Sequence, residues 1–128
     1  MLSRRPDKRP RSKEAATVTK AAMRAMRQLG ITSRTFAKIV GLPEASVSRM
    51  HAGDHELRPD EKTFQLALLV VQLYRSLDAI VGGEDEVARS WLRTPNTTLG
   101  AEPLTLIQTV SGLTDVIQYL EARRRLAA

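Results

Sequence analysis

The chain has 128 residues, 42% of them hydrophobic, which is enough for one compact domain or for two small ones that share a core. It contains no cysteine, which excludes disulfides, thiolate metal sites and cysteine nucleophiles and fits a reducing cytosol. The net charge of +6 arises at the N-terminus, where residues 1–30 hold nine Lys and Arg against two acids, as expected if that end meets phosphate.

Residues 1–13 are predicted to form a flexible basic arm. They combine two prolines with six basic side chains and have no apolar residue after Leu2, so they can bury almost nothing. Such an arm either meets phosphate or only keeps the protein soluble. No apolar run follows the basic start, so no signal peptide is expected.

Three helices are predicted in the next part of the chain. The first starts at Glu14 and ends at Gly30, and its apolar stripe consists of Val18, Ala22, Met26 and Leu29. The second runs from Ser33, as its N-cap, to Val40. The third starts at Pro43 and ends near Ala52.

A long fourth helix is predicted to be the scaffold. It starts near Asp60 and Glu61, whose carboxylates favour a helix N-terminus. One apolar face comprises Phe64, Ala67, Leu68 and Val71, the other Leu66, Val70, Leu73, Leu77 and Ile80, and a narrow water-tolerant stripe comprises Gln65, Gln72, Ser76 and Ala79. A helix this apolar needs partners on both sides, so it is interpreted as a buried helix and not as a membrane span.

Three further helices are predicted after Gly82-Gly83. The first carries Val87, Trp91 and Leu92, the second starts at Pro103 and carries Leu104, Ile107 and Val110, and the last follows Gly112 and carries Val116, Ile117 and Leu120. The acids at residues 84–86 suit the N-terminus of the first of them. No stretch alternates as a strand does, so the fold is predicted to be all-α.

The stretch SRTFAKIVGLPEASVSRMHA, residues 33–52, has the features of two short helices around a tight turn. Ala37 is small where the helices cross, and Gly41 allows a positive φ in the turn. The inward apolar positions hold Phe36, Val40, Leu42, Val47 and Met50. This pattern resembles the helix-turn-helix of Xre/Cro-type repressors.

The resemblance implies a recognition helix from Glu44 to His51 that lies in a major groove of DNA. Its outward residues, the expected DNA contacts, are Glu44, Ala45, Ser46, Ser48 and Arg49. Arg49 is expected to read a guanine or a phosphate, and Ser46 and Ser48 to contact the backbone. Thr35 and Lys38 on the preceding helix are candidates for phosphate contacts. Glu44 either accepts from a cytosine amino group or caps its helix.

Neither catalysis nor metal binding is expected. Residues 90–109, SWLRTPNTTLGAEPLTLIQT, carry hydroxyls but no histidine and no paired carboxylates. His51 and His55 are four residues apart, but Gly53 interrupts the helix that would align them, and a third histidine is absent. No catalytic residue, metal ligand or cofactor is therefore predicted.

The same segment is predicted to turn a corner between helices. Pro95 ends one helix, Asn96 can bond its own backbone in a turn, and Pro103 starts the next helix. Trp91 and Leu92 would fix the corner to the scaffold helix. Two interpretations stay open from these residues, a structural corner and a surface that contacts a partner.

A longer pattern covers this corner and the last helix. It consists of Trp91-Leu92, Pro95-Asn96, Leu99-Gly100, Pro103-Leu104, Thr109, Gly112, Val116 and Leu120. The pattern resembles the C-terminal domain of the Xre/MbcA/ParS-type antitoxins, which partner RES-domain toxins, and with the helix-turn-helix the resemblance spans roughly residues 15–125. It implies an antitoxin of a type II toxin–antitoxin system that blocks the toxin's active site and binds operator DNA to regulate its own expression. RES-domain toxins resemble ADP-ribosyltransferases and consume NAD, so that chemistry would belong to the partner.

Outside the basic arm at 1–13, the resemblance implies a helix-turn-helix and dimerisation domain at 14–81 and a toxin-binding domain at 82–128. It assigns Trp91, Leu92, Leu104 and Leu120 to the core. The expected toxin contacts are Arg93, Asn96, Leu99, Gly100, Arg123, Arg124 and Arg125, although the three final arginines alone also fit a solvated helix end. The protein is expected to be a cytoplasmic homodimer within a larger complex. The rival interpretation is a stand-alone Xre-family regulator whose C-terminal part only dimerises.

Overall fold

The computed structural model describes residues 12–127, and their regular structure is helical. The helices are α1 Ser12–Gln28, α2 Ser33–Val40, α3 Glu44–His51, α4 Lys62–Val81, α5 Asp85–Leu92, α6 Pro103–Leu106 and α7 Val110–Ala127. Extended backbone pairs once among the described residues, in an isolated bridge between Asn96 and Ala101. The predicted all-α fold is confirmed. Of the predicted arm, residues 1–11 lie outside the described residues and residues 12 and 13 belong to α1.

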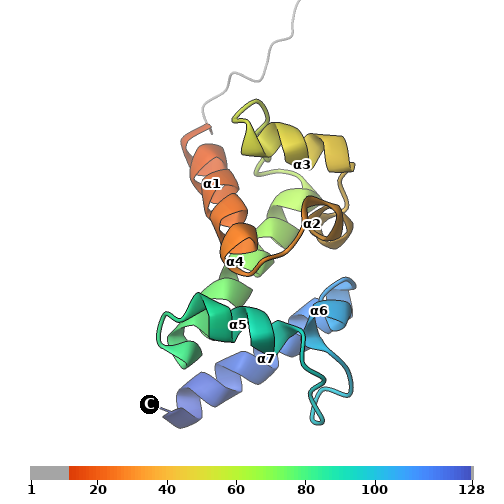
Figure 1. Ribbon diagram of the computed structural model, residues 1–128. Coiled ribbons are helices and arrows are strands. Elements are labelled where there is room, and N and C mark those ends of the chain that lie inside the picture. Colours follow the sequence, from red (N-terminus) through yellow and green to blue (C-terminus); the bar gives the residue numbers. More distant parts are fainter. Residues whose placement is uncertain (1–11, 128) are drawn as a thin grey trace, which may run out of the picture.

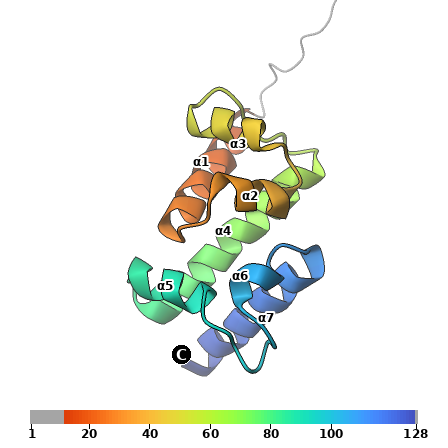
Figure 2. The same cartoon turned by 45° about the vertical axis from the view of Figure 1, so that its right-hand side comes forward.

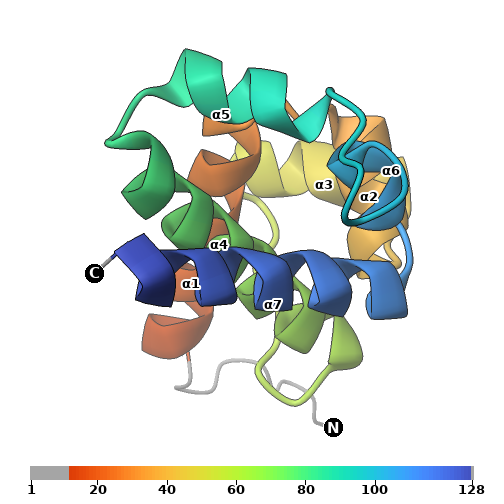
Figure 3. The ribbon, with the colours of Figure 1, turned by 90° about the horizontal axis from the view of Figure 1, so that it is seen from below.

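The helices form two groups connected by α4 (Figure 1). One group consists of α1, α2 and α3 and the other of α5, α6 and α7, with α4 running through both (Figure 2). α4 contacts α1 and α2 in the first group and α5 and α7 in the second. Seen from below, α7 lies across α4 (Figure 3). The scaffold predicted for the fourth helix is therefore confirmed.

The first group of helices has a continuous core. Ala22, Met26 and Leu29 of the predicted α1 stripe are buried, while Val18 is half-buried. The loop before α4 is held to α1 by a buried threonine. The Thr19 hydroxyl donates to the carbonyl of Ala15 at 2.7 Å and accepts from the amide of Leu57 at 3.0 Å.

Most residues of the two apolar faces of α4 pack against neighbours, but Leu68 and Ile80 are exposed. The water-tolerant stripe is narrower than predicted. Ser76 was expected to face water and is instead completely buried. The reason is that α7 covers this side of α4, where the Ser76 hydroxyl bonds to Glu121. By length and composition alone α4 is apolar enough to cross a membrane. Its position between the two groups accounts for that composition, because a central helix needs apolar side chains on several faces.

The N-cap of α2 differs from the prediction. Thr32, not Ser33, precedes the helix in an extended conformation, and its Oγ1 accepts from the amide of Thr35 at 3.1 Å. Ser33 is the first helical residue. The prediction that Ser33 caps α2 is therefore wrong by one residue.

The last helix starts earlier than predicted. α7 begins at Val110, so Gly112 lies in its first turn and Val110 does not belong to the Pro103 helix. The Thr109 hydroxyl accepts from the amide of Gly112 at 3.1 Å and so supplies a cap. A Cβ at Gly112 would collide with the carbonyl of Leu106, so glycine allows α7 to start directly against α6.

Candidate functional site

The helix-turn-helix presents a short exposed face on α3. Glu44, Ala45, Ser48 and Arg49 are exposed along it, while Val47 and Met50 are buried behind it. This placement agrees with four of the five outward residues that the sequence predicts for α3. Lys38 on α2 is exposed as well. Thr35 is half-buried, and its Oγ1 accepts from the hydroxyl of Thr32 at 3.1 Å.

Ser46 is the exception on α3. It was expected to face outward, but only 6% of it is exposed because it lies on the same side of α3 as Val47 and Met50. Its Oγ accepts a hydrogen bond from Nη2 of Arg49 at 3.2 Å. Ser46 is therefore placed to orient the Arg49 guanidinium at the exposed face.

The corner between α5 and α6 is a compact turn held by backbone hydrogen bonds. The side-chain oxygen of Asn96 accepts from the amide of Leu99 at 2.9 Å, as the sequence predicts for an Asn in a turn. The amide of Gly100 donates to the carbonyl of Asn96 at 2.8 Å, and the amide of Asn96 donates to the carbonyl of Ala101 at 3.1 Å. Thr97, Thr98 and Gly100 are exposed at its tip, and Leu99 packs partly against the core.

Aromatic and apolar side chains fix this corner to α7. The Trp91 and Tyr119 rings stack with their centroids 6.2 Å apart. Leu92 and Leu120 are buried in the core, while Trp91 and Leu104 are half-buried against it. The corner is thus both a structural element and an exposed loop of defined shape, so the two interpretations left open by the sequence are compatible.

Arg93 takes part in a contact that the sequence does not predict. Its guanidinium donates to the carbonyls of Leu29 at 3.2 Å and Gly30 at 2.7 Å, and Arg89 donates to the carbonyl of Gln28 at 2.9 Å. The two cations therefore satisfy free carbonyls at the C-terminal end of α1, which is the negative end of its helix dipole. Arg93 joins the two groups of helices, which restricts its freedom to reach a partner.

The three arginines near the end of α7 have different surroundings. Arg123 lies over the Tyr119 ring, 5.8 Å from its centroid. Arg124 forms an ion pair with Glu121 at 3.6 Å and contacts the Ser76 hydroxyl at 3.4 Å. The Ser76 hydrogen bond, followed by the charge of Arg124, holds the pKa of Glu121 below its ordinary value against the opposing effect of desolvation. Arg125 is exposed.

The histidines do not form a metal site with their neighbours. His51 ends α3 and is exposed, and His55 lies beyond the turn at Gly53. Among the described residues, no three His, Asp or Glu side chains are grouped so as to hold a metal ion.

Two family models match the chain. The helix-turn-helix domain of Xre-like antitoxins matches residues 9–71, and the C-terminal toxin-binding domain of the Xre/MbcA/ParS antitoxins matches residues 76–125. No curated protein matches it. The two matches follow each other in the order of the two helix groups and together span most of the chain. The chain therefore belongs to the Xre/MbcA/ParS-type antitoxins, and its partner is a toxin.

Proposed function

We propose that residues 82–128 bind a RES-domain toxin and block its NAD-consuming active site. The match of residues 76–125 to a toxin-binding domain carries this proposal and favours it over a stand-alone regulator. The corner supports it as well. Hydrogen bonds and the Trp91–Tyr119 stack fix its shape before binding, so little conformational entropy is lost on association.

The corner and the end of α7 supply the contacts in this proposal. Asn96, Leu99 and Gly100 form the corner surface, and Arg123 and Arg125 offer guanidinium groups to the rim of the toxin pocket. Arg124 contributes less, because its guanidinium is already bound to Glu121 and Ser76. Arg93 acts mainly by holding the corner against α1.

Residues 14–81 bind operator DNA in this proposal and so regulate the antitoxin's own expression. Arg49 reads a base or a phosphate from the position that Ser46 gives it, and Ser48, Glu44, Thr35 and Lys38 contribute contacts around it. The protein acts as a homodimer in the cytoplasm, within a larger complex with its toxin. It has no catalytic activity and no cofactor of its own.

Substitution at the tip of the corner tests toxin binding. Thr98→Arg places a long charged side chain on the exposed tip, so it should abolish co-purification of the toxin while leaving the urea unfolding midpoint unchanged. The matched control is Thr17→Arg on the exposed face of α1, which should retain the toxin. If both variants retain the toxin equally well, the corner is not the binding surface.

Substitution of Arg49 tests DNA recognition. Arg49→Ala should weaken binding to a duplex from the region upstream of its own gene by about 1–3 kcal/mol and relax the sequence preference. Arg75→Ala, which removes an exposed arginine from α4, is the charge-matched control. Unchanged affinity and unchanged preference in Arg49→Ala would exclude Arg49 from recognition.

A further inference from the structure

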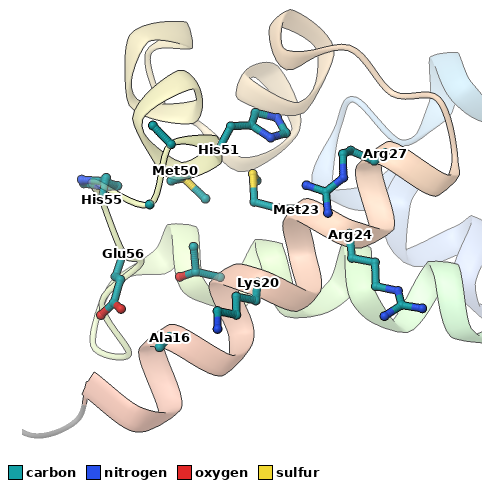
Figure 4. A pocket seen from close by; sticks show the side chains of 12 residues that line it. Ala16, Lys20, Met23, Arg24, Arg27, Met50, His51, His55 and Glu56 are labelled. Atoms are coloured by element: carbon teal, nitrogen blue, oxygen red, sulfur yellow. The ribbon is translucent and has the colours of Figure 1, made fainter.

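A groove between α1 and the segment that joins α3 to α4 has no part in the function proposed above. Figure 4 shows Lys20, Arg24 and Arg27 along α1 and His51 and His55 on the opposite side. The groove has a volume of about 470 Å³. The almost fully buried side chains of Met23 and Met50 also line it and form its base.

The groove is strongly positive. Lys20, Arg24 and Arg27 are exposed, and within residues 12–127 no ion pair engages any of them. Glu56 is the one acid among the lining residues. An open groove lined by three cations and one acid attracts an anionic ligand, and the imidazole N–H groups of His51 and His55 add hydrogen-bond donors.

The spacing of the cations suits a row of phosphates. Lys20, Arg24 and Arg27 stand at i, i+4 and i+7, so they share one face of α1 and span about 10 Å of its axis. That length corresponds to the axial rise of about three nucleotides on one strand of DNA, at roughly 3.4 Å per phosphate. A single small anion would need only one or two of these side chains.

The groove also continues the exposed face of α3. Glu44, Ser48 and His51 stand at i, i+4 and i+7 on α3 and are all exposed, so they form one edge that ends in the groove. A duplex held against α3 would therefore extend toward Arg27 and Lys20. An acidic segment of the toxin fits less well, because the groove belongs to the helix group that does not contain the corner.

We propose that this groove binds the sugar–phosphate backbone of DNA beside the base pairs that α3 reads. The inference rests on the proposed DNA binding and adds a second, sequence-independent contact surface to it. Phosphate contacts position a protein on the duplex and carry no sequence information of their own. The groove should therefore raise affinity equally for operator and for unrelated DNA.

The test is the salt dependence of DNA binding, measured by fluorescence anisotropy. The two labelled probes are a duplex from the upstream region and a random-sequence duplex of equal length. K20Q/R24Q/R27Q, the groove variant, removes three charges from the groove, and the control R58Q/K62Q/R75Q removes three from exposed positions elsewhere. Each phosphate contact contributes about 0.9 to the steepness of the plot of log K against log salt. The variant that lacks the three groove cations should therefore have a slope that is shallower by about 2.7 on both probes. A fourfold increase in salt concentration would then lower the DNA affinity of the native protein about 40-fold more than that of this variant.

Two further variants separate charge from structure. R24K/R27K retains the charge and should keep the native slope, and Glu56→Gln removes the acid and should raise affinity for both probes. The proposal is overturned if the groove variant keeps the native slope, if it changes no more than the control, or if it loses toxin instead of DNA. If the native protein binds neither probe, the proposed DNA binding fails first and the groove proposal with it.

Discussion

Gly30 lies where the end of α1 meets α5, and its replacement by alanine tests how the two groups of helices are joined. Its φ is 67°, a left-handed conformation that is unfavourable for an L-residue with a side chain by about 1–2 kcal/mol. A Cβ at this position would lie 2.8 Å from Cδ of Arg89 and 3.4 Å from Nη2 of Arg93. The Arg89 side chain must therefore shift, while Arg93 is only touched.

The shift weakens the hydrogen bond by which Arg89 reaches the carbonyl of Gln28 at the end of α1. A hydrogen bond from a charged group contributes about 1.5–3 kcal/mol, and solvent screening of these partly exposed groups reduces this to about 1–2. Gly30→Ala should thus lower the free energy of unfolding by about 2–4 kcal/mol. The matched control is Gly82→Ala, since Gly82 has a φ of 65° with no atom within 4 Å of its added Cβ and should lose only the backbone part.

Urea unfolding followed by far-UV circular dichroism measures both variants. Gly30→Ala should be less stable than Gly82→Ala by about 1–2 kcal/mol. In an Arg89→Ala background the obstructing side chain is absent. There, Gly30→Ala should lower the free energy of unfolding by little more than Gly82→Ala does. Equal losses for the two glycine variants in the native background would refute the argument, as would a Gly30→Ala penalty that Arg89→Ala leaves unchanged.

Three further predictions concern stability and use the same unfolding assay. Thr32→Ala should destabilise the protein by about 1 kcal/mol by removing the α2 cap, while Ser33→Ala should be nearly neutral; the reverse order would restore Ser33 as the cap. Leu92→Ala should lower stability by about 2–5 kcal/mol, because Leu92 is fully buried, and a loss below about 1 kcal/mol would contradict that burial. The pKa of Glu121 is lowered, first by its hydrogen bond with Ser76. The ionised carboxylate therefore stabilises the folded protein above the ordinary pKa of a glutamate, and this stabilisation is lost as the pH falls through the depressed value. The native protein should therefore lose more stability on acidification than Glu121→Gln, and identical pH profiles would disprove the contribution.

Helix positions could be predicted from the sequence because each helix carries an apolar stripe and most end at glycine or before proline. The boundaries were harder where neighbouring residues are chemically equivalent. Thr32 and Ser33 both have a capping hydroxyl, and only the backbone geometry selects Thr32. Gly112 looks like a helix break, but the close approach of the Leu106 carbonyl gives it another reason to be glycine.

Burial of small polar residues could not be predicted from one helix at a time. Ser46 and Ser76 look solvent-tolerant, yet both are buried. Ser76 donates a hydrogen bond to Glu121 on α7, whereas Ser46 accepts one from Arg49 on its own helix. The hydrogen bonds of Arg93 could not be predicted either. Its partners, the carbonyls of Leu29 and Gly30, lie more than 60 residues earlier in the chain, so the sequence around Arg93 does not indicate them. The outward residues of α3 and the corner were predicted from their motifs, whereas the stacking of Trp91 on Tyr119, which fixes the corner to α7, is tertiary.

The most direct test of the central claim is a titration of the partner toxin with the full-length antitoxin. The protein is tagged in its native host, the co-purifying partner is separated from it, and the partner's NAD consumption is measured as antitoxin is added back. The account predicts that NAD consumption falls to background at a stoichiometric amount of antitoxin, and that Thr98→Arg fails to suppress it. A partner that consumes no NAD, or recovery of only DNA and the protein itself, would contradict the proposal.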